Sequence, residues 1–277
     1  MKNILIIGST GQIGTELAMT LRRLYPVVVA GYIPAAPPKG ELLETGPCEV
    51  VDITNPQQIT EVVRRYKIDT IFNLAALLSA VAEAKPQLAW QIGLGGLFNV
   101  LEVARENGCA VFTPSSIGSF GPETPRDMTP QDTIQRPKTM YGVTKVSGEL
   151  LSDYYQKRFG VDTRSVRFPG LISNVAPPGG GVDIYYAAVR EGRFACPLRP
   201  GTYMDMMYMP DALRACVELM EADPTRLIHR NSFNITSMSF DPEGIAASIR
   251  EVIPTFEMTY ELDELRQGIA DSWPNSL

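Results

Sequence analysis

A tyrosine and a lysine spaced four residues apart are the strongest candidates for acid–base chemistry in this sequence. Tyr141 and Lys145 form a YxxxK pattern within a predicted helix, where residues i and i+4 share one face. An ammonium group beside a phenol favours the phenolate, and a tyrosine poised in this way can act as a general base near neutral pH. Two exposed helix residues are the alternative interpretation. Ser116 favours catalysis, because it follows a predicted strand and its hydroxyl can hold the substrate oxygen that Tyr141 deprotonates.

A glycine-rich segment near the N-terminus has the pattern of a dinucleotide-binding loop. It follows a predicted strand and opens a predicted helix, which is the context that such a loop requires. Glycines permit a tight turn and let a pyrophosphate approach the N-terminus of the helix. An ordinary turn between a strand and a helix is the alternative. Within the pattern GxxGxxG over residues 8–14, the predicted cofactor-binding residues are Gly8, Thr10, Gly11, Gln12 and Ile13.

Three further strand ends bear on the cofactor. The second strand ends in residues 30–33, which offer no acid for the adenosine ribose and no cation for a 2′-phosphate; Lys39 is the nearest one. We expect NAD on this basis. The third strand ends at Asp52 and Ile53, where the carboxylate either binds the adenine amino group or serves as a helix N-cap or turn residue. Small residues after the fourth strand let the cofactor lie across the sheet edge, in the segment Leu74, Ala75 and Ala76.

The composition excludes several other kinds of site. A net charge of −6 in 277 residues, with no basic patch, argues against nucleic acid as a partner. The single histidine rules out a multi-His metal site, and four scattered cysteines fit free thiols in a reducing compartment. We therefore expect no metal. The sequence has no signal peptide pattern and no stretch long enough to span a membrane, so we expect a cytoplasmic protein with no membrane partner.

Strands that alternate with helices must position these residues. Short apolar runs predict strands over residues 4–7, 27–30, 49–51, 70–74, 110–114 and 163–168, and helical patterns predict helices over residues 11–25, 56–66, 86–107 and 139–159. This alternation predicts an α/β fold with a Rossmann-type, doubly wound parallel sheet. We expect residues 1–170 to form the NAD-binding domain. Residues 171–277 are expected to form a smaller substrate-binding region, with helices over 183–191, 210–220 and 242–252 and a strand near 232–235 that returns to the sheet.

Together these motifs resemble the extended short-chain dehydrogenases/reductases. More narrowly, the chain is similar over essentially its whole length to the short-chain L-threonine 3-dehydrogenases. The glycine loop and the YxxxK motif belong to the whole superfamily, whereas the similarity to the threonine branch lies in residues 74–80, 113–121, 167–173, 177–181, 206–211 and 271–274. The single histidine agrees with this branch and sets it apart from the zinc-dependent threonine dehydrogenases.

The resemblance implies a reaction, namely the NAD-dependent oxidation of the C3 hydroxyl of L-threonine to 2-amino-3-oxobutanoate. It implies that Tyr141 removes the hydroxyl proton, that Lys145 also binds the nicotinamide ribose and that Ser116 holds the reacting oxygen. It further implies that Ser79 contacts the amino-acid head of the substrate and that Pro169 lies against the nicotinamide.

Three features depart from the pattern of this family. Tyr32 stands where an acid usually ends the second strand, and Gly93 stands where the long helix usually carries an Asn that supports a proton-relay water. A short segment containing Thr and Asp usually follows residues 177–181, and relatives usually run on past Leu277. These gaps are either deletions or residues that the sequence omits. In the second case we expect a mobile lid near Gly181 that orders on substrate binding.

The last expectations concern assembly and rival functions. An apolar helical stripe consists of Trp90, Leu94, Leu97, Leu101 and Ala104. It either packs on the sheet or forms the seam of a homodimer with the helix over 139–159, and a homodimer is the expectation. A nucleotide-sugar epimerase or dehydratase is an alternative enzyme on the same fold, although the region after Gly170 offers few basic residues for a diphosphate. A non-catalytic dinucleotide-sensing module is the third alternative, but it would not need the Ser, Tyr and Lys together.

Overall fold

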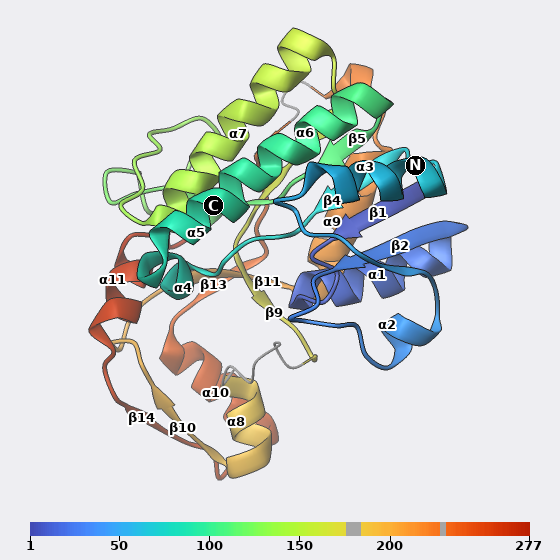
Figure 1. Ribbon diagram of the computed structural model, residues 1–277. Coiled ribbons are helices and arrows are strands. Elements are labelled where there is room, and N and C mark those ends of the chain that lie inside the picture. Colours follow the sequence, from blue (N-terminus) through green and yellow to red (C-terminus); the bar gives the residue numbers. More distant parts are fainter. Residues whose placement is uncertain (176–183, 228–230) are drawn as a thin grey trace.

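The computed structural model describes residues 1–175, 184–227 and 231–277, and its largest element is a six-stranded sheet with the order β3-β2-β1-β4-β5-β7 (Figure 1). Neighbouring strands in this sheet all run parallel. The strands are β1 (Asn3–Ile7), β2 (Val27–Tyr32), β3 (Cys48–Val50), β4 (Thr70–Asn73), β5 (Ala110–Phe112) and β7 (Thr163–Arg164). The predicted α/β fold with a Rossmann-type sheet is confirmed.

Helices cover both faces of this sheet, which explains why its strands are almost continuously apolar. One face carries α1 (Gln12–Leu24) and α9 (Met209–Glu221), and the other carries α3 (Pro56–Tyr66), α6 (Gly96–Asn107) and α7 (Met140–Phe159) (Figure 1). Side chains along β1 alternate between the two cores. Ile4 and Ile6 pack with the first group of helices, and Leu5 and Ile7 pack with the second.

The helix predicted over residues 86–107 is not regular throughout. It consists of α5 (Pro86–Trp90), a π-helical segment (Gln91–Gly95) and α6. The middle segment lies against α7, since a Cβ atom placed on Gly93 would be 3.2 Å from both Cβ and Oγ1 of Thr144. The prediction of one continuous α-helix was therefore wrong in this turn, because apolar periodicity does not distinguish a π-helical turn from an α-helical one.

The edge of the large sheet continues into three short strands. β8 (Val166–Phe168) follows β7 almost directly and pairs in parallel with β6 (Ser115–Ser116) and with β12 (Phe233–Asn234). β12 is the strand that was predicted near residues 232–235, and it comes from the C-terminal half of the chain. A short helix, α4 (Ser79–Ala84), follows β4, and a 3-10 turn (Ile117–Ser119) follows β6.

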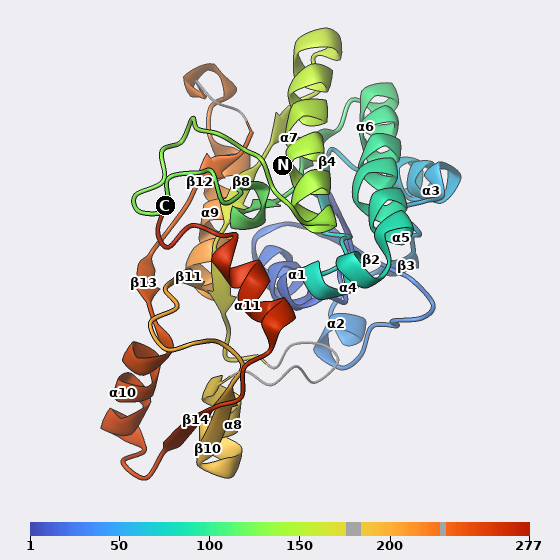
Figure 2. The same ribbon diagram turned by 90° about the vertical axis from the view of Figure 1, so that its left-hand side faces the viewer.

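Apart from α2 (Glu41–Glu44) after β2 and a 3-10 turn (Pro224–Arg226) after α9, the remaining elements form a smaller C-terminal part to one side of the large sheet (Figures 1 and 2). They are β9 (Gly170–Ile172), α8 (Ile184–Glu191), β10 (Arg193–Cys196), β11 (Met204–Tyr208), β13 (Met238–Phe240), α10 (Pro242–Val252), β14 (Glu257–Tyr260) and α11 (Glu264–Asp271). This part has its own core, formed by Ala188, Ile245, Ala246, Ile249 and Phe256. The helices predicted after residue 183 correspond to α8, α9 and α10, whereas the short strands and α11 were not predicted. The loop predicted over 176–182, Gly181 included, and the start of the helix predicted from residue 183 lie outside the described residues.

Candidate active site

The glycine-rich segment forms a bend between β1 and α1 that fits a phosphate group. Gly8 has a φ of 82°, and a Cβ atom on it would lie 2.9 Å from the backbone nitrogen of Ala75. A Cβ atom on Gly14 would lie 2.3 Å from the Gly8 carbonyl oxygen, so the loop and the helix touch through their backbones. Gly11 is the N-cap of α1, and neither a capping side chain nor an acidic residue occupies the first turn. The backbone N–H groups of Gln12 and Ile13 therefore fit a pyrophosphate.

The residues after β4 bring this bend next to the predicted catalytic helix. β4 pairs with β1, so its carboxyl end lies beside the glycine loop. Leu74, Ala75 and Ala76 line a cavity that Tyr141 and Lys145 also line. The residues that follow β4 therefore lie beside the glycine loop on one side and share a cavity with the tyrosine and the lysine on the other.

Asp52 and Ile53 lie at the end of β3, where a turn begins. Oδ1 of Asp52 accepts hydrogen bonds from the backbone N–H of Thr54 at 2.9 Å and from its hydroxyl at 2.7 Å. Ile53 is 4% exposed, and its carbonyl oxygen accepts a hydrogen bond from Asn99. One carboxylate oxygen of Asp52 thus stabilises the turn, as one of the two interpretations predicted. Adenine binding by Asp52 stays a prediction.

The structure brings Tyr141 and Lys145 together at the start of α7. Thr139 caps this helix, and its side chain accepts a hydrogen bond from the backbone N–H of Gly142. Nζ of Lys145 lies 5.3 Å from the centre of the Tyr141 ring and donates to the carbonyl oxygen of Pro114 at 2.8 Å. This carbonyl holds the ammonium group beside the phenol.

Ser116 lies at the end of β6, which contacts α7. Its Oγ atom accepts a hydrogen bond from the backbone N–H of Gly118 at 3.1 Å. A Cβ atom on Gly118 would be 3.0 Å from Cδ1 and Cε1 of Tyr141, and one on Gly142 would be 2.2 Å from the Gly118 carbonyl oxygen. The tyrosine ring therefore lies on the backbone just beyond Ser116. Ser115, rather than Ser116, lines the cavity beneath the tyrosine.

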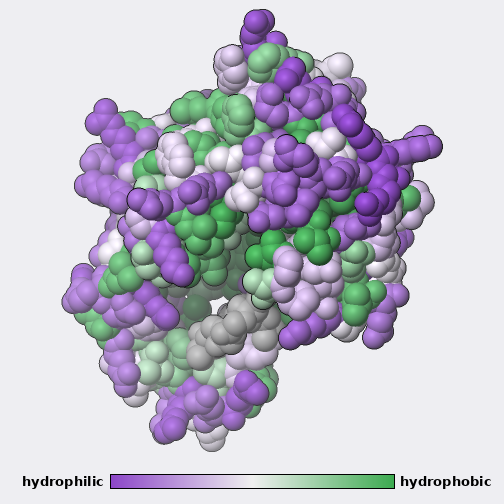
Figure 3. All heavy atoms as spheres, viewed as in Figure 1, coloured by the Kyte–Doolittle hydropathy of each residue, from purple (hydrophilic) through white to green (hydrophobic). Residues whose placement is uncertain are grey.

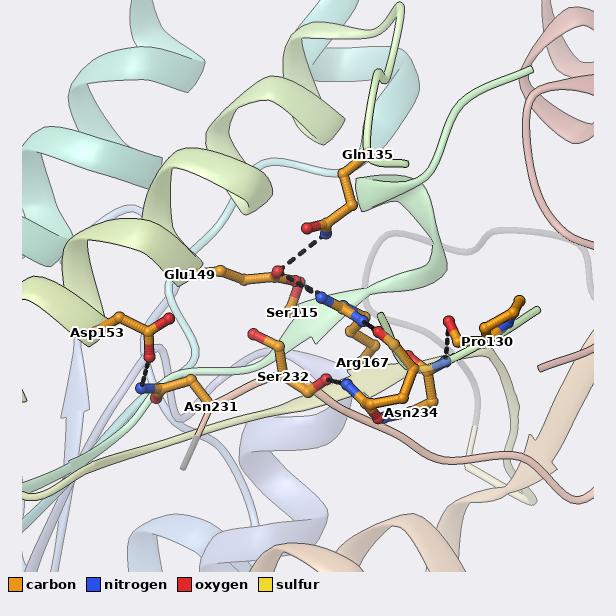
Figure 4. A network of polar contacts seen from close by, with 10 residues as sticks. Ser115, Pro130, Gln135, Glu149, Asp153, Arg167, Asn231, Ser232 and Asn234 are labelled. Atoms are coloured by element: carbon orange, nitrogen blue, oxygen red, sulfur yellow. Dashed lines mark hydrogen bonds and ion pairs between the residues drawn. The ribbon is translucent and has the colours of Figure 1, made fainter. Parts of the chain in front are cut away.

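A buried ion pair connects α7 with β6 and β8 (Figure 4). The side chains of Glu149 and Arg167 are each 7% exposed, and two guanidinium nitrogens lie 2.8 and 2.9 Å from the two carboxylate oxygens. Ser115 and Gln135 also donate hydrogen bonds to this carboxylate, and Arg167 donates to Oδ1 of Asn234 at 3.0 Å. Bidentate, charge-assisted hydrogen bonds of this kind restrict geometry strongly.

This ion pair was not predicted from the sequence. Glu149 lies one turn beyond Lys145 on the same helix, and Arg167 pairs with Ser115 in the ladder between β6 and β8. The ion pair therefore joins the helix that carries the tyrosine and the lysine to β8, the strand that pairs with the Ser116 strand β6. The spacing of four residues between Lys145 and Glu149 was the available signal, but nothing in the sequence identified the partner.

Ser79 and Pro169 approach the site from two other elements. Ser79 opens α4, and this helix is tied to α7 because the backbone N–H of Met140 donates to Oε1 of Glu83 at 2.5 Å. Pro169 follows Phe168, which pairs with Ser116. Ser79 thus lies on a helix that contacts α7, and Pro169 directly follows the strand that pairs with β6.

The C-terminal segment contributes Trp273. Its Nε1 atom lies 3.5 Å from the point that a Cβ atom on Gly118 would occupy, so the indole is close to the Tyr141 ring. Hydrogen bonds from the backbone N–H of Asn275 to the carbonyl oxygen of Arg126 at 2.8 Å hold the segment in place. Figure 3 shows the surface hollowed between the large sheet and the C-terminal part, with hydrophobic side chains around the hollow.

Two kinds of feature are absent from the described part of the chain. Within residues 1–175, 184–227 and 231–277, no three His, Cys, Asp or Glu side chains gather in a way that could hold a metal ion. Over the same residues, no helix is both long enough and apolar enough to cross a membrane.

The fold and the site define a dinucleotide-binding Rossmann protein whose serine, tyrosine and lysine lie beside the cofactor cradle. The chain belongs to the NAD dependent epimerase/dehydratase family, the model of which matches residues 4–235. A protein of Staphylococcus saprophyticus described as an uncharacterized epimerase/dehydratase is 53% identical over 284 residues, and the match covers 100% of this chain and 88% of that protein.

Two solved structures are similar over the full length. The L-threonine dehydrogenase from Clostridium difficile is 56% identical with a TM-score of 0.94, and the match covers 100% of this chain and 89% of that one. The holo form of the GalE-like L-threonine dehydrogenase from Cupriavidus necator is 46% identical with a TM-score of 0.94, covering 99% and 90% of the two chains.

Proposed function

We propose that this protein oxidises the C3 hydroxyl of L-threonine to 2-amino-3-oxobutanoate with NAD as the cofactor. The reaction class rests on the position of Tyr141, whose ring lies between the Lys145 ammonium and the backbone beside Ser116. The substrate rests on the similarity of the whole chain to L-threonine dehydrogenases at up to 56% identity. We assign cofactor binding to residues 1–170 and substrate binding mainly to residues 171–277.

In the proposed mechanism, the phenolate of Tyr141 removes the proton of the C3 hydroxyl. Lys145 places its positive charge beside the Tyr141 ring, and the Pro114 carbonyl keeps this charge in place. Bound NAD would accept the hydride that leaves C3, and the alcohol would become a carbonyl. Ser116 holds the reacting oxygen.

The remaining residues bind and orient. Ser79 would contact the amino-acid head of the substrate, Pro169 would hold the nicotinamide, and Asp52 would hold the adenine. Gly8, Gly11 and the neighbouring N–H groups hold the pyrophosphate at the N-terminus of α1.

The test is to mix the purified protein with L-threonine and NAD and to follow reduced nicotinamide by absorbance. Tyr141→Phe should lower kcat by at least about 100-fold, because it removes the proton acceptor. Tyr154→Phe is the matched control, since Tyr154 lies on the same helix but is 54% exposed; it should leave kcat unchanged. Full activity of Tyr141→Phe would mean that this tyrosine is no catalyst.

Assays on the same purified protein distinguish the rival functions. If NAD binds but threonine is not oxidised, nucleotide sugars are the next substrates, as expected for an epimerase or dehydratase. If no substrate reacts while NAD still binds, the dinucleotide-sensing alternative gains support.

We also propose a homodimer, but through a different surface from the predicted stripe. Leu97, Leu101 and Ala104 are buried against the sheet, so most of that stripe belongs to the core. The exposed apolar side chains of these helices include Trp90 of α5, Phe98 of α6, and Val143, Leu150, Tyr154 and Phe159 of α7, which are 37–65% exposed. Val143, Leu150 and Tyr154 recur at helical spacing, as in a helix–helix seam.

Light scattering after size-exclusion chromatography tests the dimer. Leu150→Glu should give a monomer, because it places a charge on the apolar surface. Val252→Glu is the control, since Val252 is 83% exposed on α10. A wild-type monomer, or dimers of Leu150→Glu, would refute this interface.

A further inference from the structure

The end of β2 lies directly against the glycine loop. The carbonyl oxygen of Gly31 accepts hydrogen bonds from the backbone N–H groups of Gly8 and Ser9 at 3.2 and 3.1 Å, and from the Ser9 hydroxyl at 2.9 Å. The next residue is Tyr32, the last residue of β2, which is half-buried. Tyr32 therefore occupies the position at which Rossmann folds hold the adenosine ribose.

The charge at this position decides between the two nicotinamide dinucleotides. An acid binds the ribose 2′-hydroxyl of NAD and repels the 2′-phosphate of NADP. Tyr32 offers a phenol and no carboxylate, and the six residues that follow it carry no charge. The structure therefore lacks the usual barrier to a 2′-phosphate at the end of β2.

The first charged residue after β2 is a cation. Lys39 lines a groove along α1, together with Thr15 and Met19 of that helix. Three cations (Arg23, Lys39 and Arg214) and three carboxylates (Glu16, Glu41 and Glu218) line this groove. The two signs balance there, so the groove as a whole gives no net repulsion of a phosphate.

We propose that this site binds NADP about as well as NAD, and that Tyr32 is the residue that removes the discrimination. The inference concerns the cofactor of the proposed dehydrogenase and thus rests on the proposed function, although binding alone suffices to test it. A phenol cannot form the hydrogen bond that a carboxylate forms to the ribose. The affinity for both dinucleotides therefore depends on the glycine loop and the strand ends.

Isothermal titration calorimetry with NAD and with NADP, without substrate, is the test. The two dissociation constants of the wild type should agree within about tenfold. Tyr32→Asp should weaken NADP relative to NAD by about 100-fold, because like charges then face each other. Tyr32→Phe is the matched control, since it keeps the ring and adds no charge, and its ratio should stay near that of the wild type.

Two results would overturn the inference. One is a wild type that binds NADP at least about 100-fold more weakly than NAD, and the other is Tyr32→Asp with an unchanged ratio. Thermal melting of each variant shows whether it is folded. The outcomes for the two proposals are separable: threonine oxidised with NAD alone would refute only the cofactor inference. Equal binding of both cofactors without threonine oxidation would refute only the proposed reaction.

Discussion

The ion pair between Glu149 and Arg167 should be the most sensitive polar contact in the site. Both side chains are 7% exposed, and the carboxylate accepts four hydrogen bonds, from Ser115, from Gln135 and two from Arg167. Glu149→Gln keeps the shape but leaves the guanidinium buried without a counter-charge. Breaking a buried pair in this way costs about 3–5 kcal/mol, a large share of the roughly 5–15 kcal/mol that stabilises a domain.

Urea denaturation followed by circular dichroism measures this cost. The double variant Glu149→Gln/Arg167→Met should recover most of the lost stability, because removing both charges leaves neither unpaired. Arg214→Gln is the control. Arg214 forms an exposed pair with Asp211, and its loss should cost under about 1 kcal/mol. The reasoning is refuted if Glu149→Gln costs no more than this control, or if the double variant is less stable than the single one.

The remaining predictions concern packing, pH and thiol reactivity. Gly118→Ala should lower kcat by about 100-fold while the protein stays folded, because the added Cβ atom would lie 3.0 Å from two carbons of the Tyr141 ring and displace it. Gly268→Ala in α11 is the control, since no atom lies within 4 Å of its added Cβ; steady-state kinetics should show no change. Burial raises the pKa of the Cys109 thiol to about 11. Because this folded-state pKa lies above the unfolded value of about 8.5, the thiol's contribution to stability is present below that value and is lost as the pH rises toward 11. Urea midpoints across this range should fall, and constant midpoints would contradict the assignment. Cys48 is half-buried and the other three cysteines are buried, so a thiol reagent should label one group per native chain and none in Cys48→Ser.

The elements that the sequence predicted well are those whose burial leaves a local pattern. β1 and β4 are buried on both faces, so the sequence predicted each of them to within one residue at either end. β10 and β14 gave no such signal, because they are short, partly exposed and paired across more than sixty residues of chain, as in the pairing of Phe194 with Met258. Tertiary pairing rather than local preference determines strands of this kind.

The same difference explains the outcome for the site. Tyr141 and Lys145 belong to one helix, so their spacing predicts that they lie on the same face. Glu149 and Arg167 lie 18 residues apart on different elements, and they meet because α7 packs against β6 and β6 pairs with β8. Leu97 and Leu101 were expected in a dimer seam but are buried against the sheet. A periodic apolar stripe does not reveal whether it faces a sheet or a second molecule.

The contacts of the site divide its chemistry between the two parts of the chain. Tyr141 and Lys145 are held largely by backbone groups, namely Gly118 and the Pro114 carbonyl. The positions of these backbone groups do not depend on which substrate is bound. Trp273, which lies beside the same tyrosine, belongs instead to the C-terminal segment that hydrogen-bonds to the loop at Arg126. In the proposed reaction, hydride transfer therefore depends on the parallel sheet and its helices, whereas the choice of substrate depends mainly on the later elements. Substitutions of Trp273 should accordingly change the KM for threonine more than the affinity for NAD, and equal effects on both would contradict this division.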